Sequence, residues 1–220
     1  MRFRSAANLA SSASVHHVPV MTDDAERVID LYERHAETWD RERWRNLFER
    51  PWLDRFLALI PRGGSIVDIG CGSGEPIARY FIDAKCKMTG VDSSPAMIGR
   101  CKQRFPDETW IMADMRSLTL GRTFDGILAW DSFFHLRPDD QRKMFPIFRS
   151  HATPNAALMI NTGPQAGEAI GSYYGERLYH ASLAPTEYRW LLTENGFEVV
   201  SHVVEEQASG GRTIWLAQLR

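Results

Sequence analysis

Three glycines at alternate positions follow a short apolar stretch in the first third of the chain. Residues 65–69 are typical of a buried strand, and Gly70, Gly72 and Gly74 stand in the loop after it. Glycine has no Cβ, so such a loop lets the backbone turn sharply and approach a ligand closely. A helix is expected to begin near Pro76, and the free amide groups at its N-terminus favour an anionic group. The pattern predicts a ligand at the end of this first strand.

Strand and helix patterns alternate through the rest of the chain. Apolar stretches predict strands at 65–69, 87–91, 109–112, 124–130 and 156–161, and helical spacing predicts helices at 76–82, 95–105, 139–151 and 185–195. Two further strands, 197–204 and 212–219, are joined through a serine and two glycines and predict an antiparallel hairpin. We therefore expect an α/β, three-layer Rossmann-like sandwich, with a mostly parallel seven-stranded sheet that ends in a C-terminal antiparallel β-hairpin.

The N-terminal part of the chain divides into a tail and a helical cover. Residues 1–21 hold many serines and alanines and no acid. This composition resembles a transit peptide, but a flexible tail, with Met21 as an alternative start, is the simpler explanation. Residues 22–60 are expected to be helical, and residues 22–220 to form a single domain. Five residues of this cover recur at helical spacing: Val28, Leu31, Tyr32, His35 and Trp39.

Composition narrows the class of protein. The chain has 220 residues, of which 44% are hydrophobic, and a formal net charge of −2. This charge does not favour a surface for nucleic acid or an anionic membrane, and no apolar run is long enough to span a bilayer. The three cysteines, Cys71, Cys86 and Cys101, form no metal-ligand spacing, and their odd number favours reduced thiols and a cytoplasmic setting. Composition leaves both a monomer and a homodimer open.

The glycine loop differs from the fingerprint of a dinucleotide site. That fingerprint is GxGxxG, and the position of its third glycine is occupied here by Glu75. Asp68, one residue before the end of the strand, would repel a pyrophosphate but suits a cationic amino group. The loop therefore favours an amino-acid end over a nicotinamide cofactor, and an NAD-dependent oxidoreductase is kept only as an alternative.

Four linked elements carry a family resemblance. The run from Asp68 to Gly74 resembles motif I of class I S-adenosylmethionine-dependent methyltransferases, and Asp92 stands at the end of the second strand, where that family has an acid. Asp114-Met115 and the run from Phe124 to Trp130 resemble two further motifs. The resemblance implies S-adenosylmethionine as cofactor, with Asp92 on the ribose hydroxyls and Asp114 on the adenine amino group.

The chemistry of these two acids agrees with the implied roles. A carboxylate can accept hydrogen bonds from both ribose hydroxyls, and the adenine amine is likewise a donor. The alternative is that Asp92 and Asp114 only cap the segments that follow them. The resemblance implies a set of cofactor-binding residues: Tyr32, Trp39, Arg43, Asp68, Gly70, Cys71, Gly72, Gly74, Asp92, Ser93, Met97, Asp114, Met115, Ala129 and Trp130.

The N-terminal helix carries a second resemblance. Tyr32, Ala36, Trp39, Asp40 and Arg43 follow a pattern that is similar to the helix lying over the cofactor in many small-molecule methyltransferases. The resemblance implies that Tyr32 and Trp39 close the site and that Arg43 pairs with the methionyl carboxylate. The alternative is that the aromatic residues belong to the core and that the arginine is solvated.

The acceptor is expected to lie beside the run from Trp130 to Leu136. His135 is a candidate base by its place after the fourth strand and by its ordinary pKa, the alternative being a histidine that packs beside the cofactor. Asp131 has no companion Asp-Asn pair, so no metal is expected. Asn-Pro-Pro-Tyr, which base amino methyltransferases carry at this place, is absent. A small molecule is therefore the expected partner, and a nucleic acid is not.

Residues 163–184 show no clear period and are expected to be an insertion on the acceptor side. Tyr173, Tyr174, Tyr179 and His180 suit an aromatic pocket, although an ordered surface loop with stacked rings would look the same. Tyr179 and His180 join His135 as catalytic candidates. The predicted function is methyl transfer to oxygen, nitrogen or carbon of a small molecule, and a non-catalytic cofactor-binding relative remains an alternative.

Overall fold

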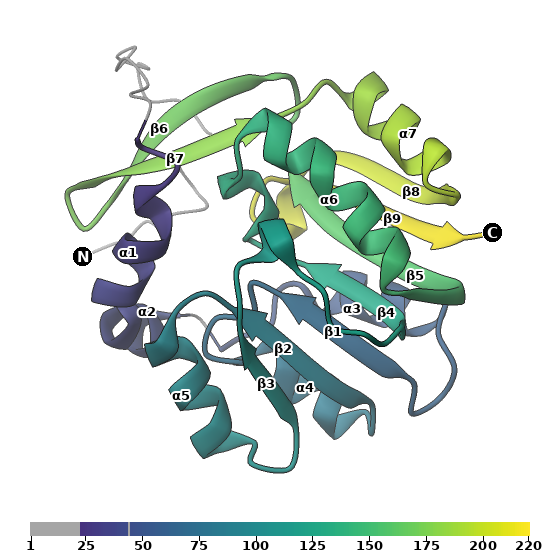
Figure 1. Cartoon of the computed structure of the whole chain (residues 1–220), viewed down its shortest axis with the longest axis horizontal. Helices are drawn as coiled ribbons and strands as arrows, with labels where there is room; N and C mark the ends of the chain where they lie inside the picture. Colours follow the sequence, from purple (N-terminus) through teal and green to yellow (C-terminus); the bar gives the residue numbers. More distant parts are fainter. Residues whose placement is uncertain (1–22, 44) are drawn as a thin grey trace.

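The computed structural model describes residues 23–43 and 45–220 and contains one large sheet (Figure 1). Its strands in spatial order are β3 (Thr109–Met112), β2 (Lys87–Asp92), β1 (Ser65–Ile69), β4 (Phe124–Ala129), β5 (Ala152–Thr162), β9 (Arg212–Leu219) and β8 (Phe197–Glu206). Strands β1 to β5 pair in parallel, and β9 runs antiparallel to both of its neighbours. The predicted seven-stranded, mostly parallel sheet with a C-terminal hairpin is confirmed.

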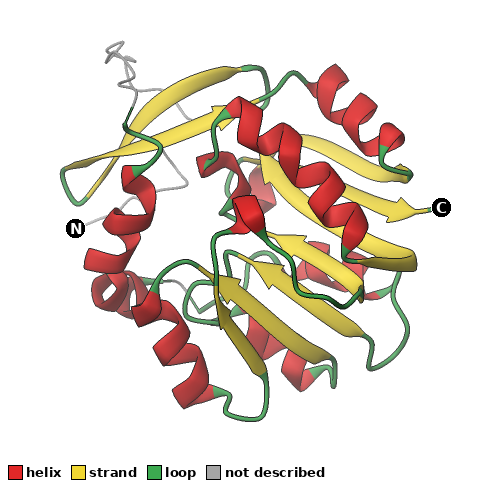
Figure 2. Ribbon diagram, in the orientation of Figure 1, coloured by secondary structure: helices red, strands yellow, loops and turns green. Residues whose placement is uncertain are grey.

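Helices cover both faces of this sheet (Figure 2). The helices α6 (Pro138–Ser150) and α7 (Pro185–Glu194) share a buried cluster with one face, and α3 (Arg50–Leu57), α4 (Ile77–Asp83) and α5 (Pro95–Arg104) share another with the opposite face. Side chains alternate along the strands, so that Ile66 and Leu128 join the second cluster while Val67 and Ile127 join the first. None of the helices α1 to α7 is long and apolar enough to cross a membrane.

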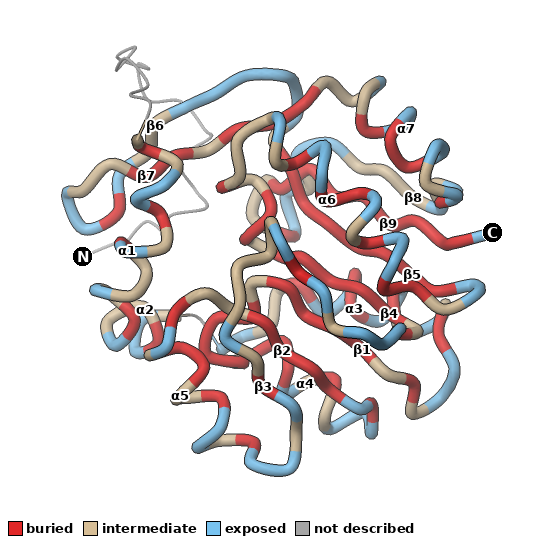
Figure 3. Tube along the Cα trace, in the orientation of Figure 1, coloured by how far each residue is buried: buried red, intermediate tan, exposed pale blue. Residues whose placement is uncertain are grey.

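The interior of the sheet is buried along most of its length (Figure 3). Phe124, Phe145 and Phe148 are fully buried against one face, and Phe56 and Phe81 against the other. Burying one such side chain contributes about 1.5–3 kcal/mol, so the two clusters supply most of the stabilisation. They hold the strand ends in fixed positions, and the loops at those ends carry the site.

The N-terminal cover is a bent pair of helices. α1 (Arg27–Arg34) and α2 (Ala36–Glu42) are separated at His35, whose backbone leaves the helical region at φ −102° and ψ 10°. The prediction that residues 22–60 are helical is wrong in part, because Arg50–Leu57 is the only helix among the described residues of 45–60 and Leu47 has a positive φ of 47°. Pro51 lies in the first turn of that helix, where a proline is well accommodated. The predicted tail, 1–21, lies outside the described residues.

The segment that shows no period in the sequence is a β-hairpin. β6 (Gly167–Tyr173) and β7 (Glu176–Ser182) pair antiparallel as a separate two-stranded sheet. Their turn residues, Tyr174 and Gly175, have positive φ values of 49° and 84°, which suit the twist of a tight hairpin. One face of the hairpin packs on α1 in a third core, the cover cluster: Val28, Leu31, Tyr173, Leu178, Tyr179 and Ala181. The hairpin and the N-terminal helices therefore form one lid over the strand ends.

Two glycines allow a matched test of the packing. A Cβ on Gly126 in β4 would lie 2.6 Å from the Phe56 ring, whereas a Cβ on Gly99 in α5 meets nothing within 4 Å. We expect Gly126→Ala to lower the free energy of unfolding by about 1–3 kcal/mol through overpacking. Gly99→Ala should raise it by about 0.5–1 kcal/mol, because glycine is a poor helix former. Urea unfolding measures both, and equal effects of the two variants would contradict this description of the core.

Candidate cofactor and acceptor site

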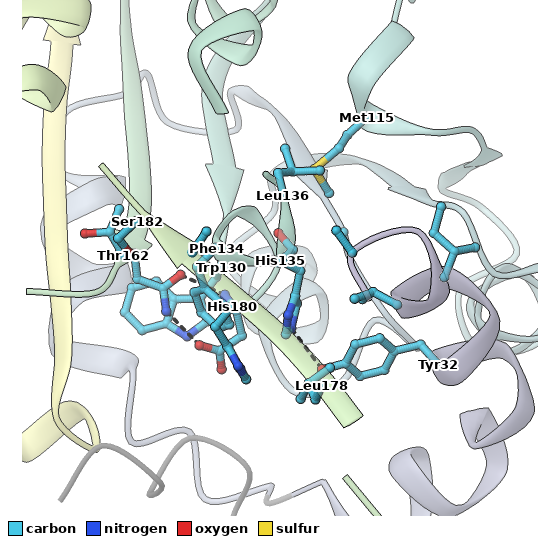
Figure 4. Close-up of a pocket in the computed structure, with 18 of the residues that line it drawn as sticks. Tyr32, Met115, Trp130, Phe134, His135, Leu136, Thr162, Leu178, His180 and Ser182 are labelled. Atoms are coloured by element: carbon cyan, nitrogen blue, oxygen red, sulfur yellow. Dashed lines mark hydrogen bonds between the residues drawn. The ribbon is translucent and has the colours of Figure 1, made fainter. Parts of the chain in front are cut away.

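A cavity of about 910 Å³ lies between the carboxyl ends of β1, β2 and β4 and the lid. Its walls come from the glycine loop, the loops after β2, β3 and β4, helix α1 and the hairpin β6–β7. Figure 4 shows lining residues from α1, the loops after β3 and β4, and the hairpin. The strand order reverses between β1 and β4, and such a reversal is where open α/β sheets bind ligands. The volume is at the upper end of what small-molecule sites enclose.

The three loop glycines are required by protein packing as well as by chain geometry. All three have positive φ: 83° at Gly70, 54° at Gly72 and 79° at Gly74. A Cβ on Gly70 would lie 2.2 Å from Ser132, and one on Gly72 would lie 2.9 Å from the Trp39 ring. A Cβ at either position would therefore clash within the protein, and the close approach of this backbone to a ligand stays a prediction. Gly70 and Gly72 line the cavity, and Gly74 faces Phe105.

Asp68 brings a buried carboxylate to the floor of the cavity. The residue is 3% exposed, and its Oδ1 has no hydrogen-bond partner among the described residues. Burial and then the nearby Asp92 raise the pKa of this carboxyl to about 8, although Arg43 opposes the shift. A ligand ammonium group would supply the missing donor and counter-charge. This residue therefore fits the amino end of S-adenosylmethionine.

Asp92, at the end of β2, can still accept hydrogen bonds from a ligand in the cavity. Its Oδ2 accepts from the Gly72 amide at 2.8 Å, and its Oδ1 accepts from the Ser94 amide at 2.9 Å. Burial raises the pKa of Asp92 above its ordinary value. The helix cap is supplied by Ser94, whose Oγ accepts from the Met97 amide at 3.1 Å, so Asp92 is not the cap of α5. Each carboxylate oxygen can still accept one more hydrogen bond, as two ribose hydroxyls would require.

Asp114 lines the same cavity, and Arg116 uses most of its acceptor capacity. It caps the short helix η2 (Met115–Ser117) by accepting from the Arg116 amide at 2.9 Å. The Arg116 side chain donates three more hydrogen bonds to this carboxylate, at 2.6 to 3.1 Å. The Nε hydrogen is shared between both oxygens, so three hydrogens meet about four lone-pair sites and one site stays free. Asp114 therefore does cap η2, and its contact with an adenine amine stays a prediction.

A hydrogen-bonded pair joins the two sides of the cavity. Tyr32 of α1 and His135 of the short helix η3 (Phe133–His135) lie 3.0 Å apart, from the hydroxyl oxygen to Nε2 (Figure 4). Nδ1 of His135 lies 2.8 Å from the carbonyl oxygen of Tyr179. A carbonyl only accepts, so Nδ1 carries the proton and Nε2 accepts from the Tyr32 hydroxyl. Burial lowers the pKa of His135 to about 4, partly offset by the Tyr179 carbonyl, so the ring is neutral at neutral pH.

His180 and Phe134 extend this pair into an aromatic wall. Their rings stack at 5.4 Å and 27°, and the His180 and His135 ring centroids lie 4.9 Å apart. Burial, followed by the neighbouring His135, lowers the pKa of His180 to about 3. Tyr179 differs from the other catalytic candidates, because its side chain does not line the cavity and its hydroxyl donates to Glu168 at 2.6 Å. Its backbone oxygen is its contribution to the site.

The cover helices reach the glycine loop through Trp39, Asp40 and Arg43. Asp40 accepts from the Ser73 hydroxyl at 2.6 Å and binds the Arg104 guanidinium, which holds the Asp40 pKa well below its usual range. Arg43 donates to Glu49 at 2.7 Å, and Glu49 is fully buried. Trp39 and Arg43 both line the cavity, so the predicted solvated alternative for the arginine is wrong.

A second ion pair at the cavity wall was not predicted from the sequence. Arg212, the first residue of β9, donates two hydrogen bonds of 2.6 Å to Asp131. Asn161 donates to the same carboxylate at 2.7 Å. Burial raises the pKa of Asp131, but Arg212 outweighs it and the net shift is downward. The signal that could have revealed the pair is an arginine at the start of a strand whose residues are all buried.

The cavity collects most of the predicted cofactor residues. Gly74 and Ala129 do not line it; those that do are Tyr32, Trp39, Arg43, Asp68, Gly70, Cys71, Gly72, Asp92, Ser93, Met97, Asp114, Met115 and Trp130. Among the described residues, no group of three or more His, Cys, Asp or Glu is arranged to hold a metal ion. The geometry is that of an organic ligand site with one acid on its floor and a second at its side.

A family model described as a methyltransferase domain matches residues 27–202. The chain belongs to this methyltransferase family. The match spans the glycine loop, the cover helices and the hairpin, so the resemblance to class I S-adenosylmethionine-dependent methyltransferases is confirmed, and S-adenosylmethionine follows as the cofactor of the family.

Two curated relatives are similar to this methyltransferase over part of its length. Malonyl-[acyl-carrier protein] O-methyltransferase of Anoxybacillus flavithermus is 29% identical over 153 residues, which are 68% of this chain and 53% of the relative. Trans-aconitate 2-methyltransferase of Escherichia coli O6:K15:H31 is 34% identical over 116 residues, 50% of this chain and 44% of the relative. The matches thus span about half the length of these relatives.

Solved structures share the fold at low sequence identity. The 1,6-didemethyltoxoflavin N1-methyltransferase of Burkholderia thailandensis, solved with its acceptor and S-adenosylhomocysteine, superposes with a TM-score of 0.68 at 18% identity and covers 92% of each chain. The magnesium protoporphyrin IX methyltransferase of Synechocystis PCC 6803, solved with S-adenosylmethionine, has a TM-score of 0.67 at 18% identity and covers 92% of this chain and all of its own. At these identities the likeness shows the fold.

The raised pKa of Asp68 makes cofactor binding dependent on pH. An ammonium group binds the ionised carboxylate, so binding releases a proton and affinity rises as the pH approaches 8. Proton linkage predicts that affinity for S-adenosylhomocysteine increases about 50-fold from about pH 6 to 8. Asp68→Asn should weaken binding by about 2 kcal/mol or more and flatten the profile. Calorimetry in buffers of different ionisation enthalpy measures the released proton. If the affinity of the wild-type protein varies with pH as little as that of the variant, Asp68 does not bind the amino group of the cofactor.

Proposed function

We propose that this protein transfers the methyl group of S-adenosylmethionine to a small-molecule acceptor held against the wall formed by Phe134, His135 and His180. The observation that carries the proposal is the hydrogen bond from Tyr32 to His135, which stands where the cofactor side and the acceptor side of one cavity meet. S-adenosylmethionine supplies an electrophilic methyl group on a sulfonium centre. Methyl transfer needs alignment and exclusion of water more than strong acids and bases.

The floor of the cavity is suited to hold the cofactor. Asp68 and the amides of the glycine loop would bind the amino-acid end, because one offers an unpaired buried carboxylate and the others offer backbone donors. Asp92 would accept from the ribose hydroxyls with the lone pairs that Gly72 and Ser94 leave free. Ser93, Met97 and Met115 line the same side and would pack around the adenosine.

The Tyr32–His135 pair orients the acceptor side. The Tyr179 carbonyl fixes the His135 tautomer, and the lowered pKa keeps Nε2 unprotonated throughout the neutral range. The Tyr32 hydroxyl is held by this nitrogen and can accept a hydrogen bond from an acceptor N–H or O–H. Because burial lowers the pKa of His135 to about 4, the ring orients this hydroxyl and does not take up a proton at neutral pH. His135 thereby fixes the polar edge of the wall, and His180 contributes a second neutral ring.

Two further expectations form part of the proposal. The cysteines of the described residues, Cys71, Cys86 and Cys101, are free and buried, which supports a reducing, cytoplasmic setting. The alternative of a non-catalytic relative is disfavoured because Asp68, Asp92 and the Tyr32–His135 pair are all arranged around one cavity. The proposal holds equally for a monomer and a homodimer.

Removing the pair should slow transfer and spare cofactor binding. We expect Tyr32→Phe and His135→Ala each to lower turnover about 100-fold, as misplacement of a reacting group does. The double variant should lose little more, because the two side chains act as a unit. Transfer of a labelled methyl group to a panel of small phenols and amines measures turnover, and calorimetry with S-adenosylhomocysteine measures affinity.

Tyr80→Phe is the matched control. Tyr80 lies on α4 and its hydroxyl donates to Asp54, away from the cavity, so this variant loses the same atom without touching the site. Turnover of Tyr32→Phe equal to that of Tyr80→Phe would contradict the role of the pair. A wild-type protein that does not bind S-adenosylhomocysteine would overturn the proposed function as a whole.

A further inference from the structure

Acidic side chains dominate the charged lining of the cavity. Among the described lining residues there are eight acids, four arginines and no lysine. Two of the acids, Asp68 and Asp92, lie on the cofactor side. Others line the same cavity, among them Glu168 of the hairpin, Asp131 after β4, and Glu26, which binds Arg116. An anion entering this cavity meets a field of its own sign.

Three of the four arginines of the lining are hydrogen-bonded to these and neighbouring acids. Arg212 is 7% exposed and is bound by Asp131 through both carboxylate oxygens. Arg43 is bound to the buried Glu49, and Arg116 to Asp114 and Glu26. Arg137 differs, because its Nε has no hydrogen-bond partner among the described residues and the Glu26 carboxylate lies 3.9 Å from it. A carboxylate on the acceptor would have to displace an internal partner to reach Arg43, Arg116 or Arg212, at a cost that a neutral molecule does not meet.

The wall that faces the acceptor is aromatic and uncharged. Phe134 and His180 are stacked, His135 lies edge-on to Phe134 at 4.7 Å, and Tyr32 lies edge-on to His135 at 5.4 Å. Burial keeps both imidazoles neutral at neutral pH. Leu178 and Ile170 of the hairpin complete this side with apolar surface. Flat rings in such an arrangement bind another flat ring by stacking and edge contacts.

We propose that the acceptor is a planar aromatic molecule of neutral or positive charge, that it carries its methyl-accepting nitrogen or oxygen on the ring edge toward Tyr32, and that carboxylates are rejected. This inference rests on the proposed function and names its substrate class. It separates the protein from the relatives named for malonyl and trans-aconitate substrates, both of which carry carboxylates. The Asp131–Arg212 ion pair determines this specificity, because Asp131 neutralises the arginine that would otherwise bind an anion.

Matched ligand pairs test the proposal on the wild-type protein. The pairs are catechol and protocatechuate, tryptamine and indoleacetate, and aniline and para-aminobenzoate, with trans-aconitate added as a non-aromatic anion. Saturation-transfer NMR on the complex with S-adenosylhomocysteine gives the affinity of each. We expect every carboxylate to bind at least about tenfold more weakly than its uncharged or cationic counterpart. Equal or tighter binding of the carboxylates overturns the proposal, and so does the absence of binding by all of the other rings.

Two variants and a control locate the preference. Asp131→Asn should raise the affinity for protocatechuate about tenfold or more, because Arg212 loses its counter-charge. Asp139→Asn makes the same change of charge at an exposed position and should leave the affinity unchanged. Phe134→Ala should weaken the binding of every aromatic ligand about tenfold, because it removes the stacking partner. If Asp131→Asn binds protocatechuate no more tightly than Asp139→Asn does, the Asp131–Arg212 ion pair does not determine the specificity.

Cofactor affinity distinguishes a failure of the proposed acceptor class from a failure of the proposed function. Each variant is first titrated with S-adenosylhomocysteine, which reports a folded cofactor side. Retained binding together with a preference for carboxylates refutes only the acceptor class. Loss of binding in the wild-type protein refutes the proposed function itself. If Asp131→Asn does not fold, the ligand pairs on the wild-type protein still decide the acceptor class.

Discussion

His135, a neutral imidazole on η3, hydrogen-bonds to the two other walls of the site, α1 and β7. His135 stands on η3 after β4, accepts from Tyr32 of α1, and donates to the backbone of β7. The cover cluster beneath these contacts is separate from the two cores of the sheet, and hydrogen bonds such as those of Asp40 to Ser73 and Arg104 also tie the lid to the rest of the fold. Because Nδ1 is fixed as the donor, the direction of the Tyr32 hydrogen bond is fixed as well, and the site has a defined polar edge.

The cofactor side follows from local sequence. Asp68, the three glycines and Asp92 each stand at the end of a short apolar strand, and parallel strands bring such ends to one edge of a sheet. That rule predicts which side chains meet without any knowledge of the loops. The same rule places Asp114 correctly at the cavity, yet its hydrogen bonds to Arg116 depend on a neighbour two residues away whose role no strand pattern reveals.

The acceptor side depends on contacts between distant residues. Tyr32 and His135 are separated by 103 positions, and Asp131 and Arg212 by 81, so neither pair leaves a local pattern. The hairpin β6–β7 is missed because its turn is Tyr174-Gly175, whereas the commonest turns of this kind begin with asparagine, aspartate or glycine. Only the packing of the lid shows that Tyr179 turns its side chain away while its backbone oxygen reaches His135.

The state of His135 is the most direct measure of this account. Two-bond proton–nitrogen correlation spectra of protein labelled with ¹⁵N-histidine distinguish the two neutral tautomers and the imidazolium, and loss of the signal in His135→Ala assigns it. The structure predicts a neutral ring with the proton on Nδ1 that does not titrate between about pH 5 and 8, because burial lowers its pKa. A proton on Nε2, or a titration in the ordinary range of histidine, would contradict the arrangement on which the site is built.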